Sequence, residues 1–154
     1  MPVILMQTDT TVGFLSQDEQ RLYEIKSRET TKPFIKVFSD FKTFAAPKDK
    51  SSLHSALSCN RIPHAMKNFV RRSRKTTFII KNMAFRVAKT SLHSQLLRNE
   101  SWHFSTSANQ SGKNFDRKFC EDKADIIIEN INGLSERQSS KLYKINNIKK
   151  KRIR

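Results

Sequence analysis

The 154-residue sequence predicts a single α+β domain, built on a β-sheet with helices on both faces. Short apolar runs rich in Ile, Val and Phe alternate with segments of helical periodicity. Several of these runs are apolar throughout, which is typical of strands that are buried on both sides. Neither an internal repeat nor a linker divides the chain. We therefore expect one domain over residues 1–154, with a basic tail at about 147–154.

The N-terminal half is predicted to contain two strands and up to three helices. Ser16 and Glu19 form a capping box, which indicates the start of a helix. Pro33 prevents a helix from continuing and favours an extended segment around it. The expected elements are a strand over 3–6, a helix over about 17–26, a strand over 34–38, a loop over 39–52, and weak helices over 53–60 and 64–72.

The C-terminal half is predicted to be richer in strands. Met66, Phe69 and Val70 form the buried side of the helix that leads into it. Thr90 can cap a later helix that carries three leucines on one side. The expected elements are a basic loop over 71–75, strands over 76–81, 83–88, 102–105, 124–129 and 142–145, the Thr90 helix, and a polar loop over 106–112.

The net charge of +16 is unevenly distributed along the chain. Residues 50–99 hold eleven bases and no acid, and residues 137–154 hold eight bases and no acid. Residues 1–20 and 100–136 each carry a net charge of −3. The basic segments indicate a phosphate-rich partner such as RNA, or a solvated surface in a lysine-rich protein. The candidate RNA contacts are Arg71, Arg72, Arg74 and Lys75.

The composition excludes several classes of site. Three glycines cannot build a Walker loop or a dinucleotide-binding loop. The four histidines lack metal-ligand spacing, so we expect no metal held by the protein. No apolar run approaches the roughly 20 residues of a membrane span, and the N-terminal run is too short for a signal peptide. Cys59 and Cys120 are expected to be reduced thiols, and the protein to be cytoplasmic.

Three basic residues, Lys26, Arg28 and Lys32, lie at and just after the end of the first predicted helix. Residues two apart do not share a helix face, so Lys26 and Arg28 can converge on one anion only if the chain leaves the helix between them. Pro33 favours such an exit. A lysine point charge and an arginine fork together suit a triphosphate, whereas the alternative is that these cations only interact with the helix dipole.

Hydroxyl and amide groups follow two of the predicted strands. The segment 105–112 lies at a strand end, where open α/β sheets bind ligands, or it is a plain polar turn. Thr8-Asp9-Thr10 can receive a small polar substrate, or form a turn in which Asp9 bonds its own backbone. Arg86 lies within an apolar strand. Because an unpaired buried arginine is costly, it faces water, an anionic ligand or an internal carboxylate.

These motifs follow one another in a recognisable order. The segments are Gln7-Thr8-Asp9-Thr10 with Gly13, Lys26-Ser27-Arg28 with Lys32-Pro33, Thr77–Ile80 with Ala84-Phe85-Arg86-Val87, Ser105 to Gly112, and Ser139-Ser140-Lys141-Leu142. In this order they resemble the YrdC family of threonylcarbamoyl-AMP synthases, over nearly the whole chain. The resemblance implies a twisted mixed sheet with a positive concave surface. It also implies L-threonine, bicarbonate and ATP as substrates, with Mg²⁺ on the triphosphate.

The resemblance implies a role for each candidate residue. ATP and its phosphates would be held by Lys26, Arg28, Lys32, Thr77, Ser107 and Asn109. Threonine would be held by Thr8, Arg86 and Ser140, with Arg86 on the carboxylate. The reaction needs no covalent nucleophile from the protein, so positioning and charge stabilisation would carry it. The product would serve N6-threonylcarbamoyladenosine formation on tRNA, together with the proteins of a transferase complex.

Some positions depart from the family pattern and leave a second hypothesis open. Gln7 and Glu29 stand where the family has proline, and Ser73-Arg74-Lys75 replaces a Pro-Gly-Pro turn. The helix that normally precedes the first strand is also missing. The second hypothesis is a YrdC-like protein with weakened catalysis that binds double-stranded RNA or tRNA. Saturable ATP binding that depends on Arg28 and Asn109 distinguishes the two.

Overall fold

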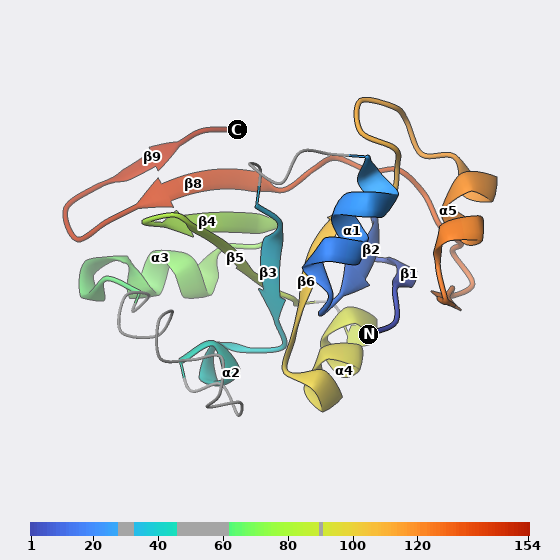
Figure 1. The fold of residues 1–154 in the computed structure, drawn as a ribbon. Coiled ribbons are helices and arrows are strands. Elements are labelled where there is room, and N and C mark those ends of the chain that lie inside the picture. The colour runs from blue at the N-terminus through green and yellow to red at the C-terminus, as the bar shows by residue number, and fades with distance from the viewer. Residues whose placement is uncertain (28–32, 46–61, 90) are drawn as a thin grey trace.

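The computed structural model of the protein describes residues 1–27, 33–45, 62–89 and 91–154. Within these residues, nine strands form one twisted mixed sheet in the order β7-β1-β2-β6-β3-β5-β4-β8-β9 (Figure 1). The strands are β1 (Ile4–Gln7), β2 (Val12–Ser16), β3 (Ile35–Phe38), β4 (Thr76–Ile80), β5 (Met83–Val87), β6 (Trp102–Ser107), β7 (Ile126–Ile128), β8 (Lys141–Ile145) and β9 (Lys150–Arg152). The helices are α1 (Glu19–Lys26), α2 (Phe41–Ala45), the 3-10 helix η1 (His64–Met66), α3 (Lys67–Arg72), α4 (Ser91–Glu100) and α5 (Arg117–Lys123). The predicted α+β fold class is confirmed.

Strand pairing brings together segments that are far apart in the sequence. β1 and β2 form an antiparallel hairpin, and β6 pairs antiparallel with both β2 and β3. The parallel pairs are β1 with β7, β3 with β5, and β4 with β8. β9 returns antiparallel on β8. Strands from the last third of the chain therefore form both edges of the sheet.

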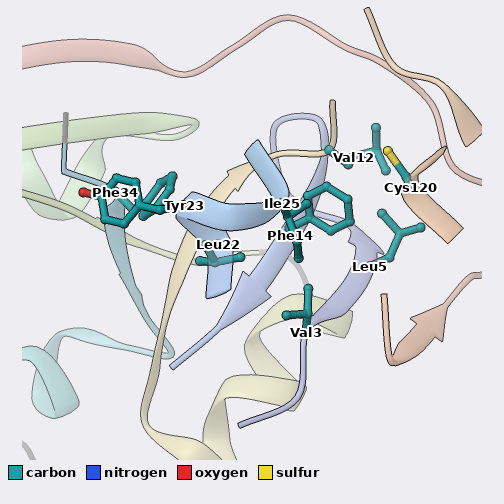
Figure 2. Close-up of a cluster of buried hydrophobic side chains, with 10 residues drawn as sticks. Val3, Leu5, Val12, Phe14, Leu22, Tyr23, Ile25, Phe34 and Cys120 are labelled. Carbon is teal, nitrogen blue, oxygen red and sulfur yellow. The ribbon is translucent and has the colours of Figure 1, made fainter. Parts of the chain in front are cut away.

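One face of the sheet carries the larger part of the core. α1 and α5 bury Leu22, Ile25 and Cys120 against the β1–β2 hairpin, as Figure 2 shows. α2 and α3 pack over β4 and β5 in a second cluster. Phe104 of the first cluster and Phe85 of the second lie in one row across β6, β3 and β5, so the two clusters share this face.

The opposite face, called the α4 face below, is covered by α4 over part of its width. Leu92 and Leu96 of α4 pack near β1 and β2, and Leu97 packs on Val37 of β3. Side chains alternate along a strand, so Arg86, which follows Phe85, points to the α4 face. Thr77 of the neighbouring β4 points the same way. Among the described residues no helix covers this face over β4 and β8.

The first helix begins later than predicted, and the capping-box prediction is wrong. α1 starts at Glu19, and its N-cap is Asp18, whose carboxylate accepts a hydrogen bond from the backbone N–H of Arg21 (3.1 Å). The Ser16 hydroxyl instead accepts from the backbone N–H of Asp18 (3.0 Å). Ser16 is the last residue of β2, a strand that the sequence did not predict.

Two short helices also lie outside the predicted set. α2 occupies part of the segment predicted to be a loop, since Phe44 is buried and Asp40 accepts a hydrogen bond from the backbone N–H of Thr43 (2.7 Å). α5 begins after Asp116, which caps it through the backbone N–H of Phe119 (3.0 Å). The helix predicted over 53–60 lies outside the described residues. The one predicted over 64–72 is confirmed as η1 followed by α3.

The basic segments differ from their predicted structure. Arg71 and Arg72 fall in both the predicted helix 64–72 and the predicted loop 71–75, and they belong to α3. Residues 150–152 of the predicted tail form β9, whose three side chains are exposed. The domain boundaries 1–154 stay a prediction. Across the described ranges, no helix has the length and apolar character needed to cross a bilayer.

Candidate functional site

Two predicted ligand-binding motifs meet at the end of α1. Lys26 is 3% exposed, and its ammonium donates to the backbone carbonyl oxygens of Ser107 (2.9 Å) and Asn109 (2.6 Å), and to Asn109 Oδ1. The backbone N–H of Ser111 donates to the carbonyl oxygen of Lys26 (3.3 Å). α1 ends here because Ser27 takes the left-handed conformation, with φ of 47°. The chain thus leaves the helix directly after Lys26, as the phosphate-site hypothesis requires.

The loop after β6 is also ordered from within. Asn109 Oδ1 accepts a hydrogen bond from the Ser107 hydroxyl (2.7 Å), and its amide nitrogen donates to the carbonyl oxygen of Lys113. Ser107 remains exposed and Asn109 half-buried. The loop therefore presents polar groups to solvent on a backbone that the buried Lys26 holds. Lys26 itself acts here on the loop, because its ammonium is already surrounded by acceptors.

Gly13 connects this loop to the turn between β1 and β2. It lies opposite Ser107 in the β2–β6 register. A Cβ at Gly13 would lie 2.8 Å from the Thr106 carbonyl oxygen and 3.1 Å from the Thr8 methyl group. Both distances are shorter than the ordinary van der Waals contacts of a Cβ atom. Only glycine lets the Thr8 turn and the loop after β6 approach each other this closely.

The turn after β1 contains a buried ion pair with Arg86. Arg86 and Asp9 are each 4% exposed at the side chain, and Arg86 Nε lies 3.4 Å from Asp9 Oδ1. Arg86 Nη1 donates to the Thr10 hydroxyl (2.8 Å). The Thr8 hydroxyl lies 3.2 Å from that of Thr10 and donates to the carbonyl oxygen of Thr11 (2.7 Å). Of the alternatives for Arg86, the internal carboxylate is the one observed.

His93 of α4 approaches Asp9 as well. It is fully buried, and its Nδ1 lies 3.9 Å from Asp9 Oδ1. Burial lowers the pKa of His93 below its usual 6.5 despite the carboxylate beside it, so the imidazole is neutral at pH 7. Burial acts to raise the pKa of Asp9, but the neighbouring His93 and Arg86 outweigh it and hold that pKa below 3.8. Asp9 is therefore an ionised carboxylate inside the protein.

A second pair of hydroxyls lies beside Arg86 on the α4 face. Thr77 is fully buried and its hydroxyl is 2.8 Å from that of Ser140, which is 3% exposed. Ser140 reaches this position because the preceding segment binds the β1–β2 turn, through Ser135 N–H to Gln7 Oε1 (2.9 Å) and Arg137 N–H to the Thr11 hydroxyl (3.0 Å). Three segments that are distant in sequence, the β1–β2 turn, the β4–β5 hairpin and residues 135–140, thus meet in one region.

The predicted site residues fall into three groups. Lys26, Ser107 and Asn109 are in direct contact, and Thr8, Arg86, Thr77 and Ser140 lie around the β1–β2 turn and β4–β5. Arg28 and Lys32 lie outside the described residues. The predicted RNA contacts Arg71, Arg72, Arg74 and Lys75 form a separate exposed group at the end of α3. Among the described residues, no three His, Cys, Asp or Glu side chains are close enough to hold a metal ion.

Sequence reasoning missed His93 and the partner of Arg86. Asp9 was considered only as a ligand or turn residue, and His93 belongs to no motif. The single available signal was Arg86 itself, whose apolar neighbours required a carboxylate or a ligand somewhere in the fold. Which carboxylate depends on the sheet order, because Asp9 and Arg86 are brought together by strands that are not adjacent in sequence.

Comparisons with known proteins agree with this fold. A family model described as "Telomere recombination", for Sua5, YciO and YrdC, matches residues 2–146. P. abyssi Sua5 carrying H234A and Y235A superposes with a TM-score of 0.78 at 18% identity, over 99% of this chain and 52% of that one. P. abyssi Sua5 complexed with L-threonine gives 0.74 at 17%, over 99% and 50%. E. coli YciO gives 0.74 at 16%, over 99% and 82%.

The chain spans about half the length of the Sua5 structures that it matches. No curated protein matches its sequence. At these identities, the likeness to solved structures establishes the fold of the chain.

Proposed function

Because this chain belongs to the Sua5/YciO/YrdC family, we propose that it joins L-threonine, bicarbonate and ATP into threonylcarbamoyl-AMP and pyrophosphate. The observation that carries the proposal is the contact between Lys26 and the loop that holds Ser107 and Asn109. Two motifs separated by 81 residues and more meet through buried, charge-assisted hydrogen bonds. A loop that is fixed in this way suits a nucleotide, since binding does not have to order it.

The threonine end of the proposed site lies around Arg86. Its guanidinium would bind the threonine carboxylate, while the hydroxyls of Thr8 and of the Thr77–Ser140 pair would contact the rest of the amino acid. That the solved Sua5 structure holds L-threonine supports this choice of substrate. Gly13 lies between the two ends, so nucleotide and amino acid would meet over the β1–β2 turn.

The chemistry needs positioning and not a nucleophile from the protein. The threonine amine attacks the carbon of bicarbonate and water leaves, which gives the carbamate. A carbamate oxygen then attacks the α-phosphorus of ATP, and pyrophosphate leaves. Both steps join two bound reactants, so holding them in line supplies much of the acceleration. ATP would enter with Mg²⁺ on its triphosphate, and Arg28 and Lys32 would add positive charge there.

The decisive experiment is pyrophosphate release by the purified protein with ATP, Mg²⁺, bicarbonate and L-threonine. Release that requires threonine and is lost in Asn109→Ala supports the synthase. Release without threonine, or its absence in a folded protein, contradicts it. The product would then pass to proteins that transfer the threonylcarbamoyl group to tRNA, in the cytoplasm.

A second function, binding of double-stranded RNA or tRNA, is favoured by one observation. β4 and β8 are paired, so the acid-free segments 62–89 and 137–154 lie side by side. Each holds eight bases. Neither segment contributes an acidic side chain that would offset these bases, and this favours the binding of a polyanion. Binding of an RNA duplex that competes weakly or not at all with ATP would support an RNA surface separate from the nucleotide site.

A further inference from the structure

We infer that Asp9 and His93 are positioning residues for Arg86, which fix the direction in which its guanidinium meets a substrate carboxylate. The inference rests on the proposed function, because it assigns a support to the arginine that would bind threonine. Asp9 comes from the β1–β2 turn, Arg86 from β5 and His93 from α4. Three separate elements thus bring their polar side chains to one buried point.

The guanidinium of Arg86 meets the β1–β2 turn at two of its three nitrogens. Its Nε faces Asp9 at 3.4 Å, and Nη1 donates to the Thr10 hydroxyl at 2.8 Å. Nε is fully buried and lacks a hydrogen bond among the described residues. An incoming carboxylate therefore meets the Nη end of the group. Asp9 sets this orientation, because the edge containing Nε is turned toward it.

The cluster is incompletely bonded, which separates it from an ordinary structural ion pair. Asp9 Oδ1, Arg86 Nε and both ring nitrogens of His93 are buried without a hydrogen bond among the described residues. The gaps of 3.4 Å and 3.9 Å exceed hydrogen-bond length by less than 1 Å. Leaving such groups unsatisfied opposes folding, so a cluster kept only for stability would be closed. Contacts of this kind often tighten when the ligand binds.

His93 completes the support by approaching Asp9 Oδ1, the same oxygen that Arg86 Nε faces. It is fully buried and neutral, so Nδ1–H can donate to Asp9 without adding a second cation beside the arginine. Because the imidazole of His93 is neutral, no second cation offsets the attraction between the Asp9 carboxylate and the Arg86 guanidinium. The arrangement has the logic of a catalytic group that is oriented by a second residue, which is in turn oriented by a third.

The test compares kinetic constants in variants that keep the size of each side chain. Asp9→Asn removes the charge that orients Arg86, and we expect the KM for L-threonine to rise about tenfold, with kcat and the KM for ATP within about twofold. His93→Gln keeps a donor for Asp9 and should stay near wild type, whereas His93→Leu should raise the threonine KM. Asp125→Asn is the matched control, since Asp125 lies outside this cluster and interacts with Arg21 and the backbone N–H of Val3.

A merely structural cluster gives a different result. Asp9→Asn and His93→Leu would then lower the melting temperature and leave the threonine KM unchanged, which overturns the inference. A wild-type protein without threonine-dependent pyrophosphate release contradicts the proposed function instead. In that case the NMR signal of the Arg86 Nε–H decides: slow exchange with water that is lost in Asp9→Asn supports the orienting contact, and the same exchange in both proteins overturns it.

Discussion

Lys26 and Asn109 are joined twice, since the lysine ammonium donates to both the backbone carbonyl oxygen and the side-chain oxygen of the asparagine. The lysine closes a helix and the asparagine shapes a loop 83 residues later. The lysine is 3% exposed, so water has little access to its ammonium group. The contact therefore sets both the end of α1 and the shape of the loop after β6.

Replacing Lys26 by methionine should weaken both ATP binding and the folded state. Methionine keeps the apolar stem but removes hydrogen bonds from a charged group, which contributes about 1.5–3 kcal/mol. We expect the Kd for ATP to rise at least tenfold, measured by calorimetry, and the unfolding free energy to fall by about 2 kcal/mol. Lys118→Met on the exposed side of α5 is the control. Unchanged ATP affinity in Lys26→Met would show that the loop keeps its shape without the lysine.

Substitution of two glycines by alanine should have different effects, because each glycine is required for a different reason. At Gly13 the new Cβ meets the Thr106 carbonyl oxygen at 2.8 Å, and a backbone atom inside a sheet cannot move away cheaply. We expect Gly13→Ala to lower the unfolding free energy by roughly 1–3 kcal/mol and to impair both ends of the site. Urea unfolding and ATP binding measure the two effects.

Gly112 has open space around it but a φ of +78°. Gly112→Ala should therefore cost only the strain of the left-handed conformation, about 1 kcal/mol. If the two variants lose equal stability, close packing at Gly13 is not the cause.

Stability should fall as the pH falls from 7 to 5. Burial lowers the pKa of both His93 and His103 below 6.5, so the unfolded chain takes up protons in this range that the folded chain does not. The stabilisation that the two neutral histidines provide is complete well above pH 6.5, and it is lost as the pH falls below 6.5. Asp9, whose pKa is also lowered, adds a second loss below about pH 3.8.

Urea unfolding at pH 7.5, 6 and 5 tests this dependence. His93→Leu should reduce the slope between pH 7 and 5, because it removes one of the two buried imidazoles. A stability that stays constant or increases down to pH 5 in the wild-type protein would contradict the burial of neutral histidines.

Neutralising β9 should weaken RNA binding and spare the nucleotide site. Lys150, Lys151 and Arg152 can be replaced by threonine, which favours strands and keeps the hairpin with β8. The slope of log K against log salt concentration should decrease by about 2–3 for duplex RNA, with an unchanged Kd for ATP. Equal losses for both ligands would indicate that the hairpin contributes to the nucleotide site.

Strands with apolar runs between breakers were predictable, and elements without such a run were not. Residues 78–80 and 83–85 are apolar runs with polar residues on both sides, so their pattern was sufficient. β2 was missed because Gly13 interrupts it, although Phe14 and Leu15 are buried on opposite faces of the sheet. β9 has no apolar residue and exists only through its pairing with β8, a long-range contact that no local pattern contains.

The candidate site was predictable where a motif supplied all the polar groups. The loop containing Ser107 and Asn109 was identified from its hydroxyls and amides, and the structure brings it to Lys26. The sequence limited the partner of Arg86 to water, an anionic ligand or an internal carboxylate, but it could not decide between these three. That choice depended on the position of β5 in the sheet relative to the β1–β2 turn, and so on the whole topology.

The strand order also separates charge along the molecule. The edge formed by β7 belongs to the segment 100–136, with net charge −3, and the edge formed by β9 belongs to the segment that holds eight bases and no acid. Such a body has an electric dipole moment that runs from one sheet edge to the other. In the field of a phosphate backbone it experiences a torque before any contact forms, and so arrives with β9 forward. Added salt would shorten the range of that torque, and would slow productive encounters as well as weaken the final complex.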